Sequence, residues 1–177
     1  MKSAITIALV PQIKSGPWVF WENLEDSIAK AAGLGFDAVE LFTASATAVD
    51  TTLLQQLLKA YPIRVCAVGT GAGKVVQGLT LTDSDTNVRE AAIKFISEMI
   101  DFGADYNAPA IIGSMQGNIP QGTERTIALQ WLSEGISILA NKAEKKGVPL
   151  VYEPLNRYET NIFNSFADAV AWLKTLD

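Results

Sequence analysis

Residues 148–160 read VPLVYEPLNRYET, a short apolar run that ends in a carboxylate, a proline and a polar cluster. The first five residues, 148–152, are rich in β-forming types, which is typical of a buried parallel strand. Side chains alternate along a strand, so Val151 and Glu153 share one face. Pro154 ends the strand because it lacks the backbone N–H that a ladder needs. If the shared face lines a barrel, Glu153 lies at the rim where βα-barrel chemistry takes place.

Four further runs of β-forming residues precede this strand, and each is followed by a stretch with helical apolar spacing. The predicted strands are 5–10, 36–42, 63–68, 110–113 and 148–152, and the predicted helices are 22–34, 48–60, 88–100, 128–147 and a last one that begins at 165–168. Long polar loops are expected at 69–85 and 114–122. Strict alternation of strands and helices predicts an α/β fold with a parallel sheet and right-handed crossovers. Two architectures remain open, a doubly wound sheet and a barrel.

The composition limits the classes of function. The chain has 177 residues with no linker or shift in composition, so we expect a single domain over residues 1–177. Its net charge of −5, without any basic run, gives no electrostatic surface for nucleic acid, and no apolar run is long enough to span a bilayer. Cys66 is the only cysteine, which favours a reducing, cytoplasmic location. The absence of histidine excludes Ser-His-Asp catalysis and histidine-ligated metal within this chain.

The eight residues 153–160, EPLNRYET, resemble the fifth-strand signature of the sugar isomerases and epimerases that have a xylose-isomerase-like barrel. The likeness is greatest to the ketose 3-epimerases of the D-tagatose and D-psicose type. This resemblance implies a (β/α)8 TIM barrel, a small sugar or sugar phosphate as substrate, and a divalent metal such as Mn, Mg or Co. It implies that Glu153 is both a metal ligand and one of two acid/base carboxylates. It implies that Glu159 contacts the sugar near its carbonyl end.

Much of the site that the family implies has no counterpart in this sequence. In the family an Asp, a His and another Glu from later strands complete the metal site, and those strands would follow Asp177. Glu153 alone would hold Mn²⁺ or Mg²⁺ poorly, because such ions take about six donors. Where relatives often carry His after the Thr of the motif, this chain has Asn161. A barrel needs eight units and roughly 250 residues. We therefore expect the N-terminal portion of a TIM-barrel domain, about five βα units, with an unfilled metal site and negligible epimerase activity alone.

Four further residues are candidates for substrate binding, each beside a plainer role. Glu159 either contacts a sugar hydroxyl or forms a salt bridge with Arg157. Arg157 either orients the carboxylates with its planar fork or touches the substrate. Asn156 either braces the loop or contacts the sugar. Glu40 lies inside an apolar strand and needs a partner there, so it either lines a pocket or makes a structural hydrogen bond.

Three aromatic residues follow the first predicted strand. Trp18, Phe20 and Trp21 either form an apolar wall for the C–H face of a sugar or pack at the start of the next helix.

The leading function is a metal-dependent isomerase or epimerase that moves a proton next to a carbonyl through an enediolate. One alternative is a non-catalytic fragment or sugar-binding relic that acts through assembly. Another is an endonuclease of the same superfamily, which the acidic balance and the sugar-type motif disfavour. The first and fifth strands would leave unpaired edges, so we expect homo-oligomers or self-association through them.

Overall fold

The computed structural model describes residues 1–13, 16–21 and 23–176. Within them five parallel strands form one sheet, and the order of the strands is their order in the chain. The strands are β1 (Ala4–Leu9), β2 (Ala38–Thr43), β3 (Arg64–Gly69), β4 (Ala110–Ile112) and β5 (Leu150–Tyr152). The helices are α1 (Leu24–Gly33), α2 (Thr51–Ala60), α3 (Ala72–Gln77), α4 (Thr86–Ala104), α5 (Arg125–Lys146) and α6 (Phe166–Leu173), and a 3-10 turn, η1, spans Ser114–Gln116.

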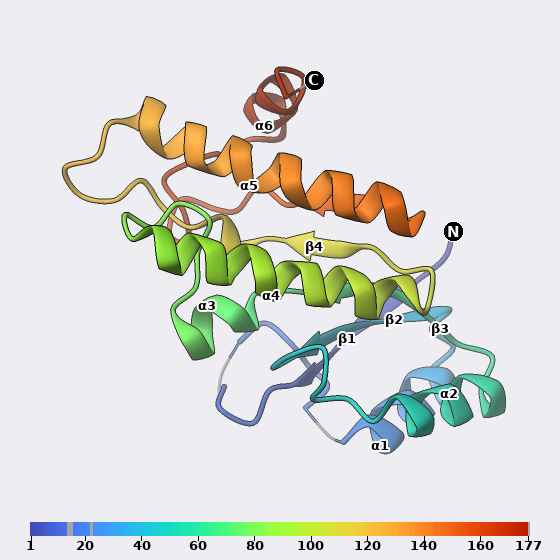
Figure 1. The fold of residues 1–177 in the computed structure, drawn as a ribbon. Coiled ribbons are helices and arrows are strands. Elements are labelled where there is room, and N and C mark those ends of the chain that lie inside the picture. The colour runs from blue at the N-terminus through green and yellow to red at the C-terminus, as the bar shows by residue number, and fades with distance from the viewer. Residues whose placement is uncertain (14–15, 22, 177) are drawn as a thin grey trace.

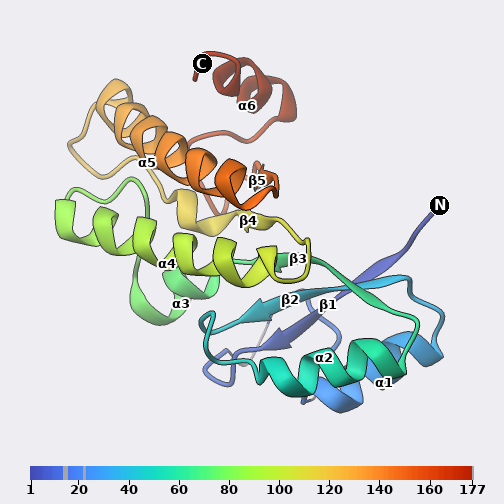
Figure 2. The ribbon, with the colours of Figure 1, turned by 45° about the vertical axis from the view of Figure 1, so that its right-hand side comes forward.

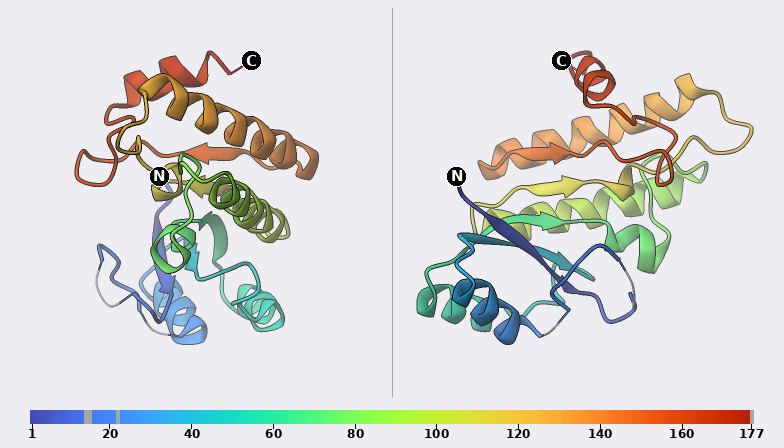
Figure 3. Two further views of the ribbon diagram at one scale, coloured as in Figure 1. Left: turned by 60° about the vertical axis from the view of Figure 1, so that its left-hand side comes forward. Right: turned by 180° about the vertical axis from the view of Figure 1, so that it is seen from behind.

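The strand order decides between the two architectures that the sequence left open. A doubly wound sheet reverses its strand order at a switch point, which places helices on both faces. Here the order runs from β1 to β5 without reversal, so right-handed crossovers bring successive helices to the same face. Helices α1 and α2 lie side by side against β1 and β2, and α4 and α5 lie side by side against the rest of the sheet (Figures 1 and 2). The view from behind shows strands in front of α4 and α5 (Figure 3). The fold is therefore a partial TIM barrel, as predicted.

Local sequence signals set the helix ends. The side chains of Asn23, Asp50, Asp85 and Ser165 each accept a hydrogen bond from a backbone N–H in the first turn of the helix that follows. Such N-caps satisfy donors that have no partner within the helix. Gly147 ends α5 in the left-handed conformation at φ 72°, which glycine adopts without steric cost. The predicted caps at 84–87 and 165–168 and the predicted helix end at Gly147 are confirmed.

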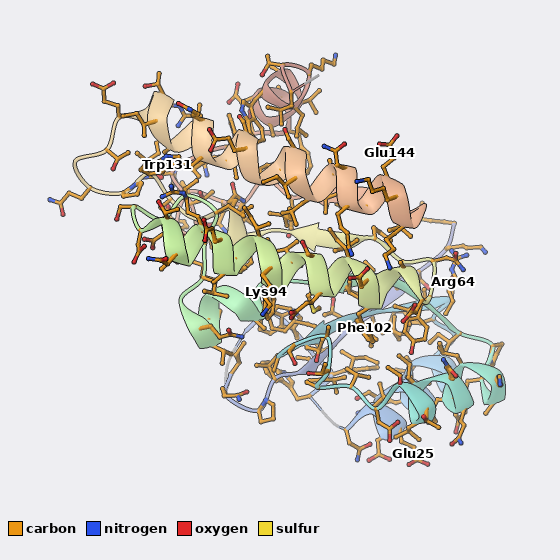
Figure 4. The ribbon with its side chains drawn as sticks, viewed as in Figure 1. Glu25, Arg64, Lys94, Phe102, Trp131 and Glu144 are labelled. Atoms are coloured by element: carbon orange, nitrogen blue, oxygen red, sulfur yellow. The ribbon has the colours of Figure 1, made fainter. Side chains whose placement is uncertain are left out.

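The main core lies between the sheet and the helices. Its largest fully buried side chains come from both layers and include Ile7, Leu41, Ile96, Met99, Ile112 and Leu132. Charged residues such as Glu25, Lys94 and Glu144 are exposed on the helices, whereas Phe102 of α4 is buried (Figure 4). The opposite face of the sheet carries a smaller cluster of Ala8, Val10, Phe42 and Ala72. That face corresponds to the inside of the barrel.

The two edge strands differ in how they are covered. Phe20 forms an isolated parallel bridge with Ile7, and the backbone N–H of Ala8 donates to the carbonyl of Phe20 at 2.9 Å. This short segment covers part of β1. At the other edge β5 is only partly buried, and Val151 keeps 37% of its surface exposed. Helix α6 packs near this edge through an aromatic cluster of Tyr152, Phe163 and Trp172, with the last two rings 4.9 Å apart.

Three predicted elements need correction. The 69–85 segment was expected to be irregular, but it contains α3, whose last turn ends at Gly78 in the left-handed conformation. The paired part of β5 is Leu150–Tyr152, because the backbone N–H of Val148 instead bonds to the end of α5 at Ala143. Helix α1 begins at Leu24, and the predicted start at Glu22 lies outside the described residues. No helix in the described ranges is long and apolar enough to cross a membrane.

Candidate functional site

A cavity of about 500 Å³ lies on the inner face of the sheet, over the carboxyl ends of the strands. All five strands or the segments that follow them contribute to it. Its lining includes Thr6 of β1, Glu40 and Phe42 of β2, Gly69 of β3, Gly113 after β4 and Glu153 after β5. The carboxyl ends of barrel strands are where TIM-barrel enzymes place their active sites. The cavity is thus in the position where this architecture places its chemistry.

Glu40 lies in this cavity as a half-buried carboxylate. The hydroxyl of Thr6 donates to its Oε2 at 3.3 Å, and a Cβ built on Gly69 would lie 3.1 Å from its Oε1. Partial burial raises the pKa of Glu40, the Thr6 hydrogen bond lowers it, and the charge of Glu153 raises it further. The two roles predicted for Glu40 are therefore both present, because it lines the cavity and also makes a structural hydrogen bond.

Glu153 lies at the mouth of the cavity, where it is partly open to solvent. Its backbone N–H continues the β4–β5 ladder by donating to the carbonyl of Ile112 at 3.0 Å. A Cβ on Gly113 would lie 2.7 Å from Glu153 Oε2, so the carboxylate occupies space that only a glycine leaves free. Partial removal from water raises the pKa of Glu153, and the charge of Glu159 adds to this effect. A carboxyl with a raised pKa can exchange a proton nearer to neutral pH.

The cavity is acidic. Glu40, Glu153 and Glu159 all line it, and no lysine or arginine is among its described lining residues. Burial is the main cause of the raised pKa values of Glu40 and Glu153, and repulsion from a neighbouring carboxylate adds to it in each case.

The loop after β5 holds Glu159 through Asn156. The amide nitrogen of Asn156 donates to Glu159 Oε2, and its amide oxygen accepts from the backbone N–H of Tyr158 at 2.9 Å. The backbone N–H groups of Glu159 and Thr160 both donate to the carbonyl of Asn156. Asn156 thus braces the loop, one of the two roles predicted for it.

Arg157 is not part of the cavity lining. Its guanidinium lies 5.2 Å from the ring centre of Tyr158 and donates to the Tyr158 hydroxyl at 3.1 Å. The predicted pairing of Arg157 with the carboxylates, including its salt bridge with Glu159, is not present among the described residues. Adjacent side chains on an exposed turn reach one another more easily than Arg157 reaches into the cavity.

The three aromatic residues after β1 line different parts of the molecule, although Trp18 and Trp21 touch edge to face with ring centres 5.5 Å apart. Trp18 lines the cavity and stacks on Phe42 with ring centres 4.5 Å apart. Phe20 is buried in the main core, and Trp21 lines a different cavity beside β1. Of these three residues Trp18 lines the cavity, together with Phe42, and a sugar-facing wall stays a prediction.

One residue of the site carried no sequence signal. Gln116 is fully buried in η1, and its amide nitrogen donates to the carbonyl oxygens of Gly113 at 2.9 Å and Glu153 at 3.1 Å. A glutamine in a polar loop usually faces solvent. Nothing in the pattern of residues 114–122 distinguishes Gln116 from such a residue.

The residues that the structure describes do not by themselves form a metal site. No group of three or more His, Cys, Asp or Glu residues placed to hold a metal ion is found within residues 1–13, 16–21 and 23–176. Mg²⁺ and Mn²⁺ take about six donors. The described residues, with Glu153 as the predicted ligand, therefore do not fit a resident metal on their own.

Comparisons with known proteins agree with this fold. A family model described as "Xylose isomerase-like TIM barrel" matches residues 28–177. The D-psicose 3-epimerase of Agrobacterium fabrum is 27% identical over 153 residues, which are 83% of this chain and 52% of that protein. The L-ribulose 3-epimerase of a Methylomonas species is 26% identical over 163 residues, which are 90% of this chain and 54% of that protein. The chain thus spans about half the length of the curated relatives that it matches.

A solved structure shows the same arrangement of elements. The D-psicose 3-epimerase from Clostridium cellulolyticum, solved with D-tagatose, superposes with a TM-score of 0.75 at 21% identity, covering 100% of this chain and 60% of that one. The sequential parallel sheet, the helices on one face and the family match lead to the same assignment. This chain belongs to the xylose isomerase-like TIM barrel family.

Proposed function

We propose that this chain carries the sugar-binding and proton-transfer face of a ketose epimerase or isomerase pocket, with Glu153 as its catalytic carboxylate. The observation that carries this proposal is the position of Glu153. It lies at the carboxyl end of β5, in a cavity of about 500 Å³, against the gap that Gly113 leaves. The names of the curated relatives, which are 3-epimerases of psicose and ribulose, support the substrate class.

Glu153 acts as the base. Its carboxylate removes the proton from the carbon next to the sugar carbonyl, and the C–H electrons form a cis-enediolate as the carbonyl oxygen takes up charge. In an epimerisation a second carboxylate returns a proton to the opposite face of that carbon. The resemblance implies that this second group comes from a later strand. The raised pKa of Glu153 supports the role, because a base works best when its pKa is near the operating pH.

The other cavity residues hold the sugar. Glu159, braced by Asn156, and Glu40, held by Thr6, accept hydrogen bonds from sugar hydroxyls. The stacked pair of Trp18 and Phe42 forms an apolar surface for the C–H face of the ring. Arg157 contributes only through the loop.

Glu153 is also the candidate ligand for the Mn, Mg or Co ion that the resemblance implies. The remaining ligands are not present in the described residues, so we expect residues 1–177 to bind sugar without turning it over. The single Cys66 supports a cytoplasmic location. The alternative, a sugar-binding relic without catalysis, is favoured by the same incomplete metal site.

Two measurements test the proposal. The first is calorimetric titration of residues 1–177 with D-psicose and D-fructose, with sorbitol, which lacks a carbonyl, as the control. Tighter binding of the ketoses is expected, and equal or absent binding of all three sugars contradicts a ketose pocket.

The second measurement uses a chimera in which residues 1–177 are joined to the second half of the Agrobacterium D-psicose 3-epimerase. We expect deuterium from D₂O to enter at C3 of the ketose, and Glu153→Gln to abolish this exchange. A folded chimera that binds the sugar but exchanges no hydrogen supports the relic. A chimera that exchanges equally well with Glu153→Gln removes Glu153 from the mechanism.

A further inference from the structure

Gln116 joins the ends of β4 and β5 through a fully buried amide. Its nitrogen donates to the carbonyl oxygens of Gly113 and Glu153, and its oxygen accepts from the hydroxyl of Tyr152 at 2.5 Å. The chemistry of the partners fixes the orientation of this amide. Carbonyl oxygens only accept hydrogen bonds, so both must face the NH₂ group, and the tyrosine hydroxyl then donates to the amide oxygen.

The amide makes as many hydrogen bonds as its donors allow. Both N–H groups are used, and the oxygen has a partner. A buried amide without partners is costly, whereas an apolar residue of the same shape avoids that cost. Packing alone therefore does not explain a glutamine here. The explanation lies in the two carbonyl groups that it holds.

These two carbonyls belong to the two residues that define the position of the candidate base. Gly113 has no side chain, and the carboxylate of Glu153 occupies the space where a Cβ of residue 113 would lie. The N–H of Glu153 is fixed by Ile112, and its C=O is fixed by Gln116. Both polar groups of the Glu153 backbone are therefore held, which fixes the direction in which its Cα–Cβ bond leaves the strand end.

We infer that Gln116 is a positioning residue that sets the Glu153 carboxylate against Gly113. The inference rests on the proposed role of Glu153 for its catalytic meaning. Tyr152 orients the amide from the outer side of the sheet, and Thr82 holds the same turn through the backbone carbonyl of Gln116 at 3.0 Å. The hydrogen bonds of the Tyr152 and Thr82 side chains go to Gln116 and Asn118 and not to Glu153.

The test compares variants that break different parts of this network. Gln116→Met keeps the length of the side chain and removes both donated bonds. Tyr152→Phe removes only the bond to the amide oxygen and leaves the two carbonyl bonds. Gln116→Glu, which keeps the acceptor and loses most of the donor capacity, serves if Gln116→Met does not fold. Thermal unfolding of each variant reports how much of the effect is loss of stability.

The readout is the nuclear Overhauser contact between the Gly113 Hα and the Glu153 Hγ protons. We expect it in the wild type and in Tyr152→Phe and expect it to disappear in Gln116→Met or Gln116→Glu. A contact that persists without the glutamine overturns the inference. The inference is also overturned if the contact is lost equally in Tyr152→Phe. In that case the amide would act only by holding the strands together.

Sugar binding separates this inference from the proposed function. If the wild-type chimera exchanges deuterium, loss of the contact should lower its exchange rate by about tenfold or more, because small displacements of a reacting group have large effects. An unchanged exchange rate would overturn the functional part of the inference. If the wild type binds no ketose while the contact depends on Gln116 as expected, the proposed function fails and the positioning role stands.

Discussion

The Oε2 atom of Glu153 lies 2.7 Å from the place where a Cβ of residue 113 would be. Real Cβ atoms do not approach an oxygen so closely. Gly113 therefore leaves the space that the Glu153 carboxylate occupies, although the two residues follow different strands of the sheet. A side chain at position 113 would force the exposed carboxylate to shift.

Gly113→Ala should displace the Glu153 carboxylate. The added methyl group competes for the space of Oε2, so we expect the chimera to lose most of its exchange activity. Deuterium exchange at C3 of the ketose measures the effect. Gly33→Ala is the matched control, because nothing lies within 4 Å of a Cβ at that position. Equal effects of the two substitutions would show that Glu153 is not constrained by this gap.

Glu40→Gln should change how stability depends on pH. The pKa of Glu40 is raised above its ordinary value of 4.5, first by burial and also by the charge of Glu153, despite the Thr6 hydrogen bond. Because the folded-state pKa of Glu40 is raised, proton binding at this carboxyl stabilises the folded state. That contribution is complete below the unfolded pKa and is lost as the pH rises through the folded pKa. Glutamine cannot ionise, so the variant should be more stable than the wild type at about pH 8.

The expected gain is on the order of 1 kcal/mol, or roughly 2–4 °C in Tm. It should shrink as the pH falls through 4.5, because only below that value is the wild-type carboxyl largely protonated in the unfolded state as well as in the folded state. Calorimetric scans at several pH values measure it. A gain that does not vary with pH would mean that ionisation of Glu40 is not its cause.

Trp18→Ala should weaken sugar binding by removing the apolar wall that Trp18 forms with Phe42. Aromatic contacts of this kind contribute about 1 kcal/mol, which corresponds to roughly fivefold in affinity. Tryptophan fluorescence during a D-psicose titration should change in the wild type. Trp21→Phe is the control, since Trp21 lines a different cavity. A fluorescence response that survives Trp18→Ala but not Trp21→Phe would assign the sugar to the other cavity.

Asn156→Asp should affect the site more than Arg157→Ala does. The aspartate would replace the amide that donates to Glu159 by a second negative charge, so the loop would lose its brace and the carboxylates would repel. We expect a clear loss of sugar affinity from Asn156→Asp and less than about twofold from Arg157→Ala, whose side chain lies outside the cavity. A larger effect of Arg157→Ala would restore Arg157 as a substrate ligand.

Residues 1–177 should self-associate as the concentration rises, because parallel edge strands offer unpaired backbone groups. Light scattering measures this directly. The exposed pair Phe166 and Val170 on α6 is a second apolar surface, with 76% and 47% of their surfaces exposed. Replacing both by serine should leave association unchanged if the edge of β5 drives it. A monomer at all concentrations would contradict both explanations.

The architecture could be predicted because its signals are local. Apolar strands such as 63–68 and polar caps such as Ser165 are visible in a few consecutive residues. Helix α3 was missed because it is a single short helix in a glycine-bearing segment, where propensity is weak. The pairing of β5 starts only at Leu150 because the backbone N–H of Val148 donates to Ala143, which local patterns do not encode.

The candidate site was predictable only where a motif covered it. Glu153 and Glu159 were identified from residues 153–160, and the cavity contains both. Glu40 was noticed because a carboxylate inside an apolar strand needs a partner. Gln116 and Gly113 were not predicted as site residues, since their importance arises from contacts across strands. Arg157 was expected to pair with the carboxylates because the sequence places it between them, but the turn directs it towards Tyr158.

The lengths of the strand ladders differ along the sheet. β1 and β2 pair over six residues, whereas β3 and β4 pair over two and β4 and β5 over three. Short ladders open more readily than long ones, so hydrogen exchange should show β4 and β5 opening while β1 and β2 stay closed. Such an opening separates Glu153 from Glu40 without unfolding the domain. The stability of the fold and the integrity of the pocket are then two distinct properties, and a variant can lose the second while it keeps the first.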